Sequence, residues 1–293
     1  MGTGPRTLLG GPVRGGRSAR CSVSDGPGEA FPQLEVGPGG GSFLGSGDDE
    51  EVTVAVTVTV MEVGACEEHL AAIVRERLGT KLRVLDAGCG RMWNWDLGDV
   101  DMHLTGIDED AEALRLRVEV KKDLDEAIVG DLRTVPLDDG AYDLVHSAYV
   151  LEHVSGAELV LDRMLAALRP GGLMVIKVPD GDSVYGWITR MTPHWVHVKY
   201  KRWIRRKKLA GTPGHGPYPV VYDDVICRRG ITEWGERHGL ELVDLSGENS
   251  HIEFFGPLKR VADLGLRAIA ALSFGRLTAR YSNLDVIFGK PTV

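Results

Sequence analysis

The sequence predicts an α/β domain with a doubly wound, mostly parallel sheet and helices on both of its faces. Two observations carry this prediction. From Met61 onward, short continuous apolar runs alternate with helical patterns, and glycines or acids stand where several of the runs end. A chain of 293 residues, 43% of them hydrophobic, is long enough to form one large domain of this kind.

The elements are expected in alternating order along the chain. A first helix is expected over 67–78, because Leu70, Ile73, Val74 and Leu78 share one helical face and Gly79 follows as a stop. Apolar runs bounded by turn residues predict strands at 82–87, 103–107, 127–130, 142–147, 173–178, 240–245 and 284–288. Helical patterns predict helices at 109–124, 157–168 and 231–238.

The chain is expected to have three parts: a Gly/Pro-rich tail (1–60), a ligand-binding core (61–180) and the C-terminal half of the same domain (181–293), which holds later loops, a basic segment and the last strands. Residues 1–47 contain 14 Gly and 5 Pro, too little apolar surface to offset the entropy of ordering them. Residues 1–60 are therefore expected to be a disordered tail, or to precede a translation start near Met61, and the sequence leaves both open. The alternation of Thr53–Val60 has the period of a strand, so these residues also fit a short edge strand.

Charge and cysteine content exclude several classes of protein. With 34 Lys and Arg against 42 Asp and Glu, the net charge is −8, which argues against general binding of nucleic acid. Cys21, Cys66, Cys89 and Cys227 form no CxxC pair, so neither a zinc site nor a disulfide scaffold is expected. No apolar run is long enough for a membrane span, and no signal peptide is recognisable. We therefore expect a cytoplasmic protein.

Three acids each follow a predicted strand. Asp86 lies in Val-Leu-Asp-Ala-Gly-Cys-Gly (84–90), where a carboxylate beside two glycines suits a cationic ligand better than a pyrophosphate. Asp108 is placed to accept the two ribose hydroxyls of an adenosine. Asp131 is placed to accept an adenine amine, while Leu132 offers a backbone N–H.

These motifs resemble the class I S-adenosylmethionine-dependent methyltransferases. The match runs through VLDAGCG (84–90), GID (106–108), GDL (130–132), YDLVHSAYVLEHV (142–154) and LRPGGLMVIKVP (168–179). The resemblance implies a Rossmann-like sheet of seven strands with the last one antiparallel, and S-adenosylmethionine as methyl donor. It also implies the residues expected against the donor: Asp86, Gly88, Cys89, Gly90, Asp108, Asp131, Leu132 and Ser147.

The acceptor is predicted less directly. After the fourth strand the chain has Ser147-Ala148-Tyr149 in place of the Asn/Asp-Pro-Pro-aromatic loop of nucleobase-amine methyltransferases, which favours a small-molecule, glycan or lipid-linked acceptor and O-methylation. His153 is either a general base or a packing histidine. The residues expected to line the acceptor pocket follow the fifth strand: Tyr185, His194, His197 and Tyr222. No acid or Cys completes a metal site with the two histidines, so no metal is expected.

Two basic segments stand outside this pattern. Residues 199–208 hold seven Lys or Arg and no acid, which suits RNA, a phosphorylated substrate, an anionic membrane or plain solvent. Residues 257–280 are rich in Leu, Ala and Arg, typical of a helix at a membrane interface, at a sheet edge or in a homodimer contact. Location at the inner face of a membrane is thus one expectation. An RNA methyltransferase and a non-catalytic S-adenosylmethionine-binding protein are the alternative functions.

Overall fold

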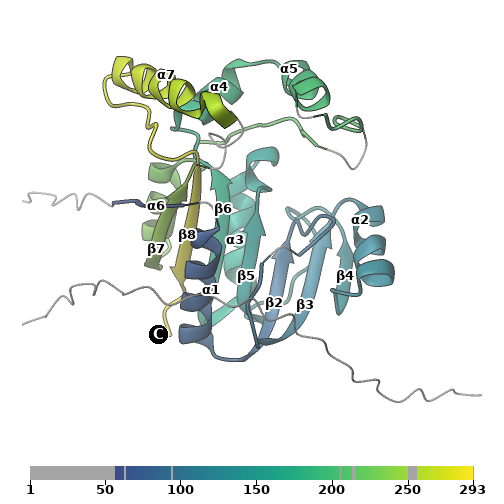
Figure 1. The fold of residues 1–293 in the computed structure, drawn as a ribbon. Coiled ribbons are helices and arrows are strands. Elements are labelled where there is room, and N and C mark those ends of the chain that lie inside the picture. Colours follow the sequence, from purple (N-terminus) through teal and green to yellow (C-terminus); the bar gives the residue numbers. More distant parts are fainter. Residues whose placement is uncertain are drawn as a thin grey trace, which may run out of the picture. The chain divides into compact units, whose positions relative to one another are not determined.

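The computed structural model describes residues 57–62, 64–93, 95–204, 206–212, 216–249 and 256–292. The chain divides into two units, 1–53 and 54–293, and all described residues belong to the second. Its centre is an eight-stranded sheet of order β1-β7-β8-β6-β5-β2-β3-β4 (Figure 1). The strands are β1 (Thr59–Met61), β2 (Lys81–Ala87), β3 (Asp101–Asp108), β4 (Glu126–Val129), β5 (Tyr142–Ala148), β6 (Leu168–Pro179), β7 (Glu241–Glu248) and β8 (Asn283–Gly289).

All neighbouring strands are parallel except where β8 is involved. β8 lies between β6 and β7 and is antiparallel to both. The confirmed prediction is thus a mostly parallel sheet whose last strand is antiparallel. The expected number of strands was seven, and the structure has eight because β1 pairs with β7 at one edge.

Helices cover both faces of the sheet, and each face has its own apolar core. On one face, α1 (Ala65–Leu78) and α2 (Ala111–Arg115) pack against side chains of β2 and β3 such as Val84 and Leu104. On the other, α3 (Ala157–Ala167) and α6 (Arg228–Arg237) pack with Leu85, Val145 and Phe288. The helix expected at 109–124 is shorter than predicted, because α2 passes into the π-helical turn η1 (Leu116–Lys121). A second short helical turn, η2 (Leu151–His153), follows β5.

A further group of helices lies at the end of the sheet where β6 ends (Figure 1). They are α4 (Val184–Met191), α5 (His194–Lys199), η3 (Tyr200–Ile204) and α7 (Lys259–Leu272). We call residues 184–212 and 257–280 the cap layer. α4 contacts α7, and the backbone N–H of Val184 donates to the carbonyl of Thr278 at 2.9 Å, so the two segments are joined.

The edge strand β1 lies where the N-terminal segment 1–60 ends. Residues 1–56, including the first half of the predicted Thr53–Val60 strand, lie outside the described residues. Thr59 and Val60 are paired with Ser246 and Gly247 of β7, and Val58 is buried in the core beside Gly247. The last residues of the segment 1–60 therefore belong to the fold, because the alternating pattern finds a partner 187 residues away in β7.

This pairing predicts different effects for two truncations. Deleting residues 1–61 removes β1 and the buried Val58, whereas deleting residues 1–56 keeps both. Burial of a Val side chain stabilises by about 1.5–3 kcal/mol, so the longer deletion is expected to lower Tm by about 5 °C relative to the shorter one. Thermal unfolding of the two proteins in parallel is the measurement. Equal melting temperatures would show that β1 does not stabilise the sheet.

Candidate active site

The site begins at the glycine turn that follows β2. The backbone N–H groups of Gly88 and Cys89 both donate to the carbonyl of Ile107 at 2.9 Å, which ties the turn to the end of β3. Gly88 has φ +76°, and a Cβ there would lie 2.3 Å from a methyl carbon of Val150. A side chain at residue 88 is therefore excluded both by backbone conformation and by space. Gly90 also has positive φ, +53°.

Asp108 holds the other side of the turn. One of its carboxylate oxygens accepts the backbone N–H of Gly90 and the other accepts that of Asp110, each at 2.8 Å. The carbonyl of Asp108 accepts the N–H of Gly130, so the ends of β3 and β4 are joined as well. The structure thus brings Gly88, Gly90 and Asp108 together at the carboxyl ends of β2 and β3, as the sequence predicted for residues sharing one sheet edge.

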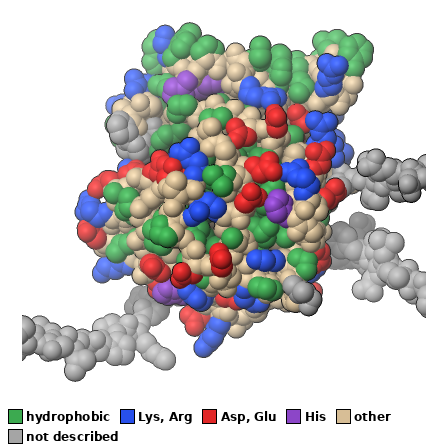
Figure 2. Space-filling view, turned by 180° about the vertical axis from the view of Figure 1, so that it is seen from behind, with side chains coloured by type: hydrophobic (Ala, Val, Ile, Leu, Met, Phe, Trp, Pro, Cys, Tyr) green, Lys and Arg blue, Asp and Glu red, His purple; other side chains and the backbone are tan. Residues whose placement is uncertain are grey.

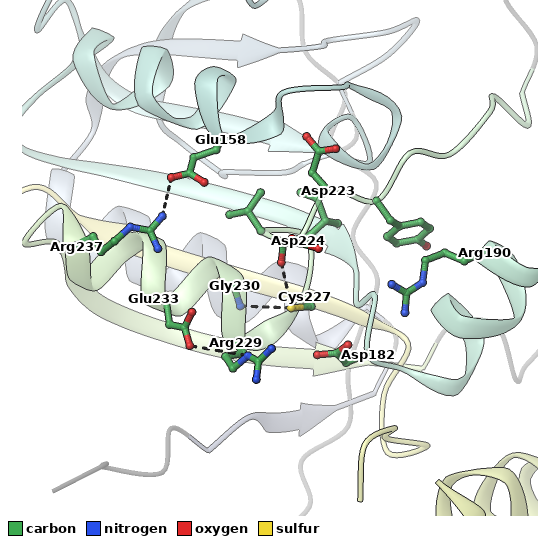
Figure 3. A pocket seen from close by; sticks show the side chains of 13 residues that line it. Glu158, Asp182, Arg190, Asp223, Asp224, Cys227, Arg229, Gly230, Glu233 and Arg237 are labelled. Atoms are coloured by element: carbon green, nitrogen blue, oxygen red, sulfur yellow. Dashed lines mark hydrogen bonds and ion pairs between the residues drawn. The ribbon is translucent and has the colours of Figure 1, made fainter. Parts of the chain in front are cut away.

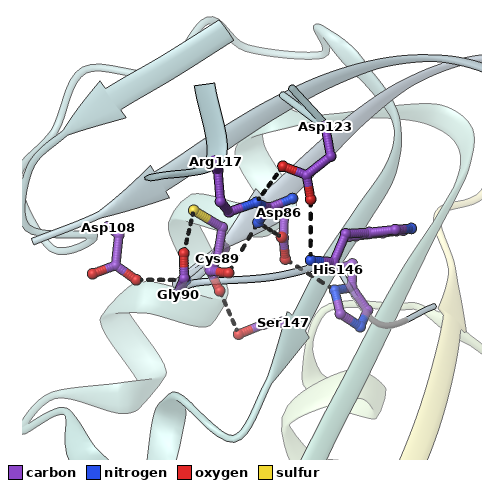
Figure 4. A network of polar contacts seen from close by, with 10 residues as sticks. Asp86, Cys89, Gly90, Asp108, Arg117, Asp123, His146 and Ser147 are labelled. Carbon is purple, nitrogen blue, oxygen red and sulfur yellow. Dashed lines mark hydrogen bonds and ion pairs between the residues drawn. The ribbon is translucent and has the colours of Figure 1, made fainter. Parts of the chain in front are cut away.

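Asp86 is buried in a polar network that sequence reasoning did not foresee (Figure 4). Its carboxylate accepts Nη1 of Arg117 at 2.8 Å and Nδ1 of His146 at 3.1 Å. The Arg117 side chain has no exposed surface and also donates to the carbonyl of Cys89 at 2.9 Å. Burial by itself lowers the pKa of Arg117, but the hydrogen bond and charge of Asp86 outweigh it and raise the pKa, so the guanidinium stays charged.

This network changes how Asp86 acts. Both of its oxygens already face protein donors, so it fixes the glycine turn through Arg117, and direct contact with a ligand cation stays a prediction. Arg117 extends the network to Asp123 at 3.2 Å, and the rings of Trp93 and Trp95 lie against His146. No local spacing links residues 31 and 60 positions from Asp86, which is why Arg117 and His146 could not be read from the sequence.

The other residues predicted to contact the donor lie nearby. Asp131 follows β4 and forms a two-pronged ion pair with Arg133, whose hydrogen bonds lower the pKa of the Asp131 carboxyl. Leu132 is buried in the core. Ser147 is buried in β5, and its hydroxyl donates to the carbonyl of Ala87 at 3.0 Å. Ser147 therefore joins β5 to the start of the glycine turn, and its contact with a donor stays a prediction.

His153 ends η2, just beyond β5. Its Nδ1 donates to the carbonyl of Pro219 at 2.7 Å, which leaves Nε2 as the basic nitrogen. Burial lowers the pKa of His153, and the charges of Lys201 and His194 act in the same direction. The imidazole is therefore neutral at pH 7 and able to accept a proton at Nε2.

Glu152, beside His153, is a buried carboxyl that the sequence analysis did not single out. Its Oε1 lies 3.8 Å from Nε2 of His153, and its Oε2 has no hydrogen-bond partner among the described residues. Burial raises the pKa of Glu152 to about 8. The segment over it supplies that burial, since the N–H of Val221 donates to the Glu152 carbonyl at 2.8 Å. A carboxyl that is neutral near pH 7 can give or take a proton during catalysis.

The residues predicted to line the acceptor pocket are spread over three segments. Tyr185 lies on α4 and His194 and His197 on α5, whereas Tyr222 lies in the loop that covers Glu152. Tyr222 is buried, with φ +52°. Nε2 of His197 lies 2.8 Å from the hydroxyl of Thr192, within its own turn of chain, and His194 is exposed. The structure therefore leaves His194 exposed and engages His197 locally.

A pocket of about 350 Å³ lies beside the N-terminus of α6 (Figure 3). Charged side chains dominate its lining: the acids include Asp182, Asp223 and Glu233, and the bases include Arg190 and Arg229. Of the residues predicted for the acceptor, Tyr222 lines it. Within the described part of the chain, no three His, Cys, Asp or Glu side chains are grouped as metal ligands, and no helix has the length and hydropathy needed to cross a membrane.

Comparison with known proteins identifies the family. A family model described as a methyltransferase domain matches residues 64–245, more than half of the chain. The chain belongs to this family. The resemblance to class I S-adenosylmethionine-dependent methyltransferases is thereby confirmed.

Individual relatives of this methyltransferase-domain protein are more distant. A malonyl-[acyl-carrier protein] O-methyltransferase of Erwinia billingiae is 31% identical over 53% of this chain and 61% of its own length. A probable S-adenosylmethionine-dependent methyltransferase of Mycolicibacterium smegmatis is 33% identical over 55% of this chain and 62% of its own length. The chain thus spans less than two thirds of the length of these relatives. The solved structure of a 1,6-didemethyltoxoflavin-N1-methyltransferase of Burkholderia thailandensis is 16% identical, with 78% of this chain and 79% of its own chain covered and a TM-score of 0.44. This similarity is too distant to bear on function.

The raised pKa of Glu152 predicts a pH-dependent stability. An unfolded Glu releases its proton near pH 4.3, about four units below the folded group, so the folded state binds more protons in this window and loses stability as pH rises through it. Glu152→Gln keeps the shape and removes the charge. We expect its stability relative to the wild type to increase between pH 5 and pH 9 by on the order of 1 kcal/mol or more.

Denaturant unfolding at several pH values measures this difference. Glu76→Gln on the exposed side of α1 is the matched control, because it removes a carboxyl that is not buried. A difference between Glu152→Gln and the wild type that stays constant from pH 5 to pH 9 would show that Glu152 is ionised throughout.

Proposed function

We propose that this protein is an S-adenosylmethionine-dependent methyltransferase that methylates an oxygen of a small-molecule, glycan or lipid-linked acceptor. The observation that carries the proposal is the glycine turn bound to Asp108 at the joined ends of β2 and β3. Family membership supports the reaction. The name of the Erwinia billingiae relative, an O-methyltransferase, supports oxygen as the accepting atom.

The donor-binding residues fit an adenosine. A carboxylate has about four lone-pair positions. Asp108 uses one on each oxygen for Gly90 and Asp110, so two positions are left for a pair of ribose hydroxyls. The absence of a side chain at Gly88 and Gly90 lets backbone approach the ligand closely. Asp86 and Arg117 act beneath the turn by holding the carbonyl of Cys89 in place.

The acceptor side needs a base when a hydroxyl is methylated. S-adenosylmethionine supplies a methyl group bound to a sulfonium, and the neutral thioether that remains after transfer is a good leaving group. The task of the protein is therefore to position the acceptor, exclude water and remove the hydroxyl proton. His153 offers neutral Nε2 for that proton, held in this tautomer by Pro219. Glu152 lies 3.8 Å from the same nitrogen, so the two groups form one pair of proton-exchanging side chains beside the proposed acceptor.

The role of Asp108 gives the direct test. Hydrogen bonds to a charged acceptor contribute about 1.5–3 kcal/mol each, so Asp108→Ala is expected to weaken S-adenosylmethionine binding tenfold or more. Asp101→Ala is the matched control, because Asp101 is the first residue of the same strand, β3, and lies at the end opposite to Asp108. Isothermal titration calorimetry measures both. Equal affinity of Asp108→Ala and Asp101→Ala for the donor would contradict the assignment of the ribose to Asp108.

Transfer itself is tested with isotopically labelled donor. Pools of hydroxylated small molecules, glycans and lipid extracts are offered to the full chain, with RNA in parallel. Label recovered in an ether or ester of a small acceptor supports the proposal. Label recovered only in RNA, or donor binding with no transfer to any pool, would contradict it.

A further inference from the structure

The cap layer presents apolar side chains to the outside. Eleven of the twenty exposed large hydrophobic residues among the described residues lie in it. Phe274 is 94% exposed, Leu272 and Trp203 are 76% exposed, and Val261 is 68% exposed. In the view from behind, hydrophobic side chains gather along the upper edge, with Lys and Arg beside them (Figure 2). Exposed apolar groups this concentrated indicate a surface that meets a partner.

The pattern along α7 shows that this exposure is organised. Ala262, Leu266 and Ile269 are half-buried on the side of the helix that faces the protein. Val261, Leu264, Ala268 and Leu272 recur every three or four residues and form an exposed stripe. An ordinary surface helix carries polar residues on its outer side. α7 instead has apolar residues on both sides and no fully buried residue.

The same layer concentrates positive charge. Residues 184–212 hold eight Lys or Arg and no acid, and residues 257–280 hold five and one acid, Asp263. The layer therefore carries 13 − 1 = +12, while the rest of the chain carries −8 − 12 = −20. Asp263, the one acid of this layer, forms an ion pair with Arg267 at 2.8 Å. So strong a segregation favours an anionic partner.

We propose that the cap layer docks on the surface of an anionic lipid bilayer. Aliphatic side chains and exposed Trp residues enter the headgroup boundary, while the surrounding Lys and Arg pair with anionic lipids. A second copy of the chain is a poor occupant, because two layers of +12 repel each other. RNA is a poorer fit too: its bases would find the exposed Trp residues to stack on, but the aliphatic stripe of α7 offers them no stacking surface and would stay without a partner.

The docking has a consequence for the candidate site. The cap layer lies at the end of the sheet where β6 ends, which is also the end that holds the glycine turn, η2 and Asp108 (Figure 1). Bilayer docking therefore brings an acceptor that resides in lipid to the side of the molecule where His153 lies. The docking itself does not depend on methyl transfer, so its test needs no activity.

Vesicle cosedimentation of the full chain tests the proposal. The probes are vesicles of phosphatidylcholine with phosphatidylglycerol and vesicles of phosphatidylcholine alone. We expect binding to the anionic vesicles, with partitioning that falls about tenfold between about 50 mM and about 500 mM NaCl as charges are screened. Absence of binding to anionic vesicles at low salt would overturn the proposal.

Two pairs of matched variants separate the apolar from the electrostatic contribution. Val261→Glu is compared with Val120→Glu, since Val261 is 68% and Val120 67% exposed but only Val261 lies in the cap layer. K207E/K208E is compared with K121E/K122E, both exposed adjacent lysine pairs. We expect the cap-layer variants to lose about tenfold in vesicle partitioning and the controls to lose little.

Thermal unfolding confirms that each variant is folded before its binding is interpreted. Equal losses in cap-layer and control variants would overturn the proposal. So would tighter binding to single-stranded RNA than to anionic vesicles. A dimer in sedimentation velocity that Val261→Glu dissolves would assign the apolar stripe to a second copy and overturn the proposal as well.

Discussion

A buried ion pair between Asp86 and Arg117 is the constraint on which the candidate site depends. A guanidinium with no exposed surface is costly unless carboxylates and carbonyls replace its water. Here Asp86 and the carbonyl of Cys89 do so at Nη1 and Asp123 at Nε, while Nη2 has no hydrogen-bond partner among the described residues. Removing one partner of such a pair costs about 3–5 kcal/mol, because the other charge stays buried. The glycine turn is thus fixed from beneath by Arg117.

From this pair a chain of hydrogen bonds crosses the sheet edge. Arg117 donates to the carbonyl of Cys89, and the backbone N–H of the next residue, Gly90, donates to one carboxylate oxygen of Asp108. The other oxygen of Asp108 accepts the N–H of Asp110, the N-cap residue of α2. The groups proposed to meet the ribose are therefore positioned by residues from β2, β3 and η1 together. The preorganisation is built before any ligand arrives, which reduces the entropic cost of binding.

Local signals predicted most of the fold and part of the site. Continuous apolar runs indicated the strands. Gly88, Gly90 and Asp108 stood out because they follow two of these runs, and parallel strands have their carboxyl ends on the same side of the sheet. Contacts between distant residues could not be predicted. His146 meets Asp86 across 60 residues, β1 meets β7 across 187, and Glu152 is buried only because the segment around Val221 folds over it. The composition of 257–280 predicted an amphipathic helix, but which of its sides faces outward required the structure.

The central claim is that the Gly88–Gly90 turn and Asp108 hold the adenosine of the donor. The most direct measurement is a crystal structure of the full chain with S-adenosylhomocysteine. The account predicts both ribose hydroxyls within hydrogen-bond distance of the Asp108 carboxylate, with the Asp86–Arg117 pair intact below them. An adenosine bound elsewhere, for example in the charged pocket beside α6, would contradict it.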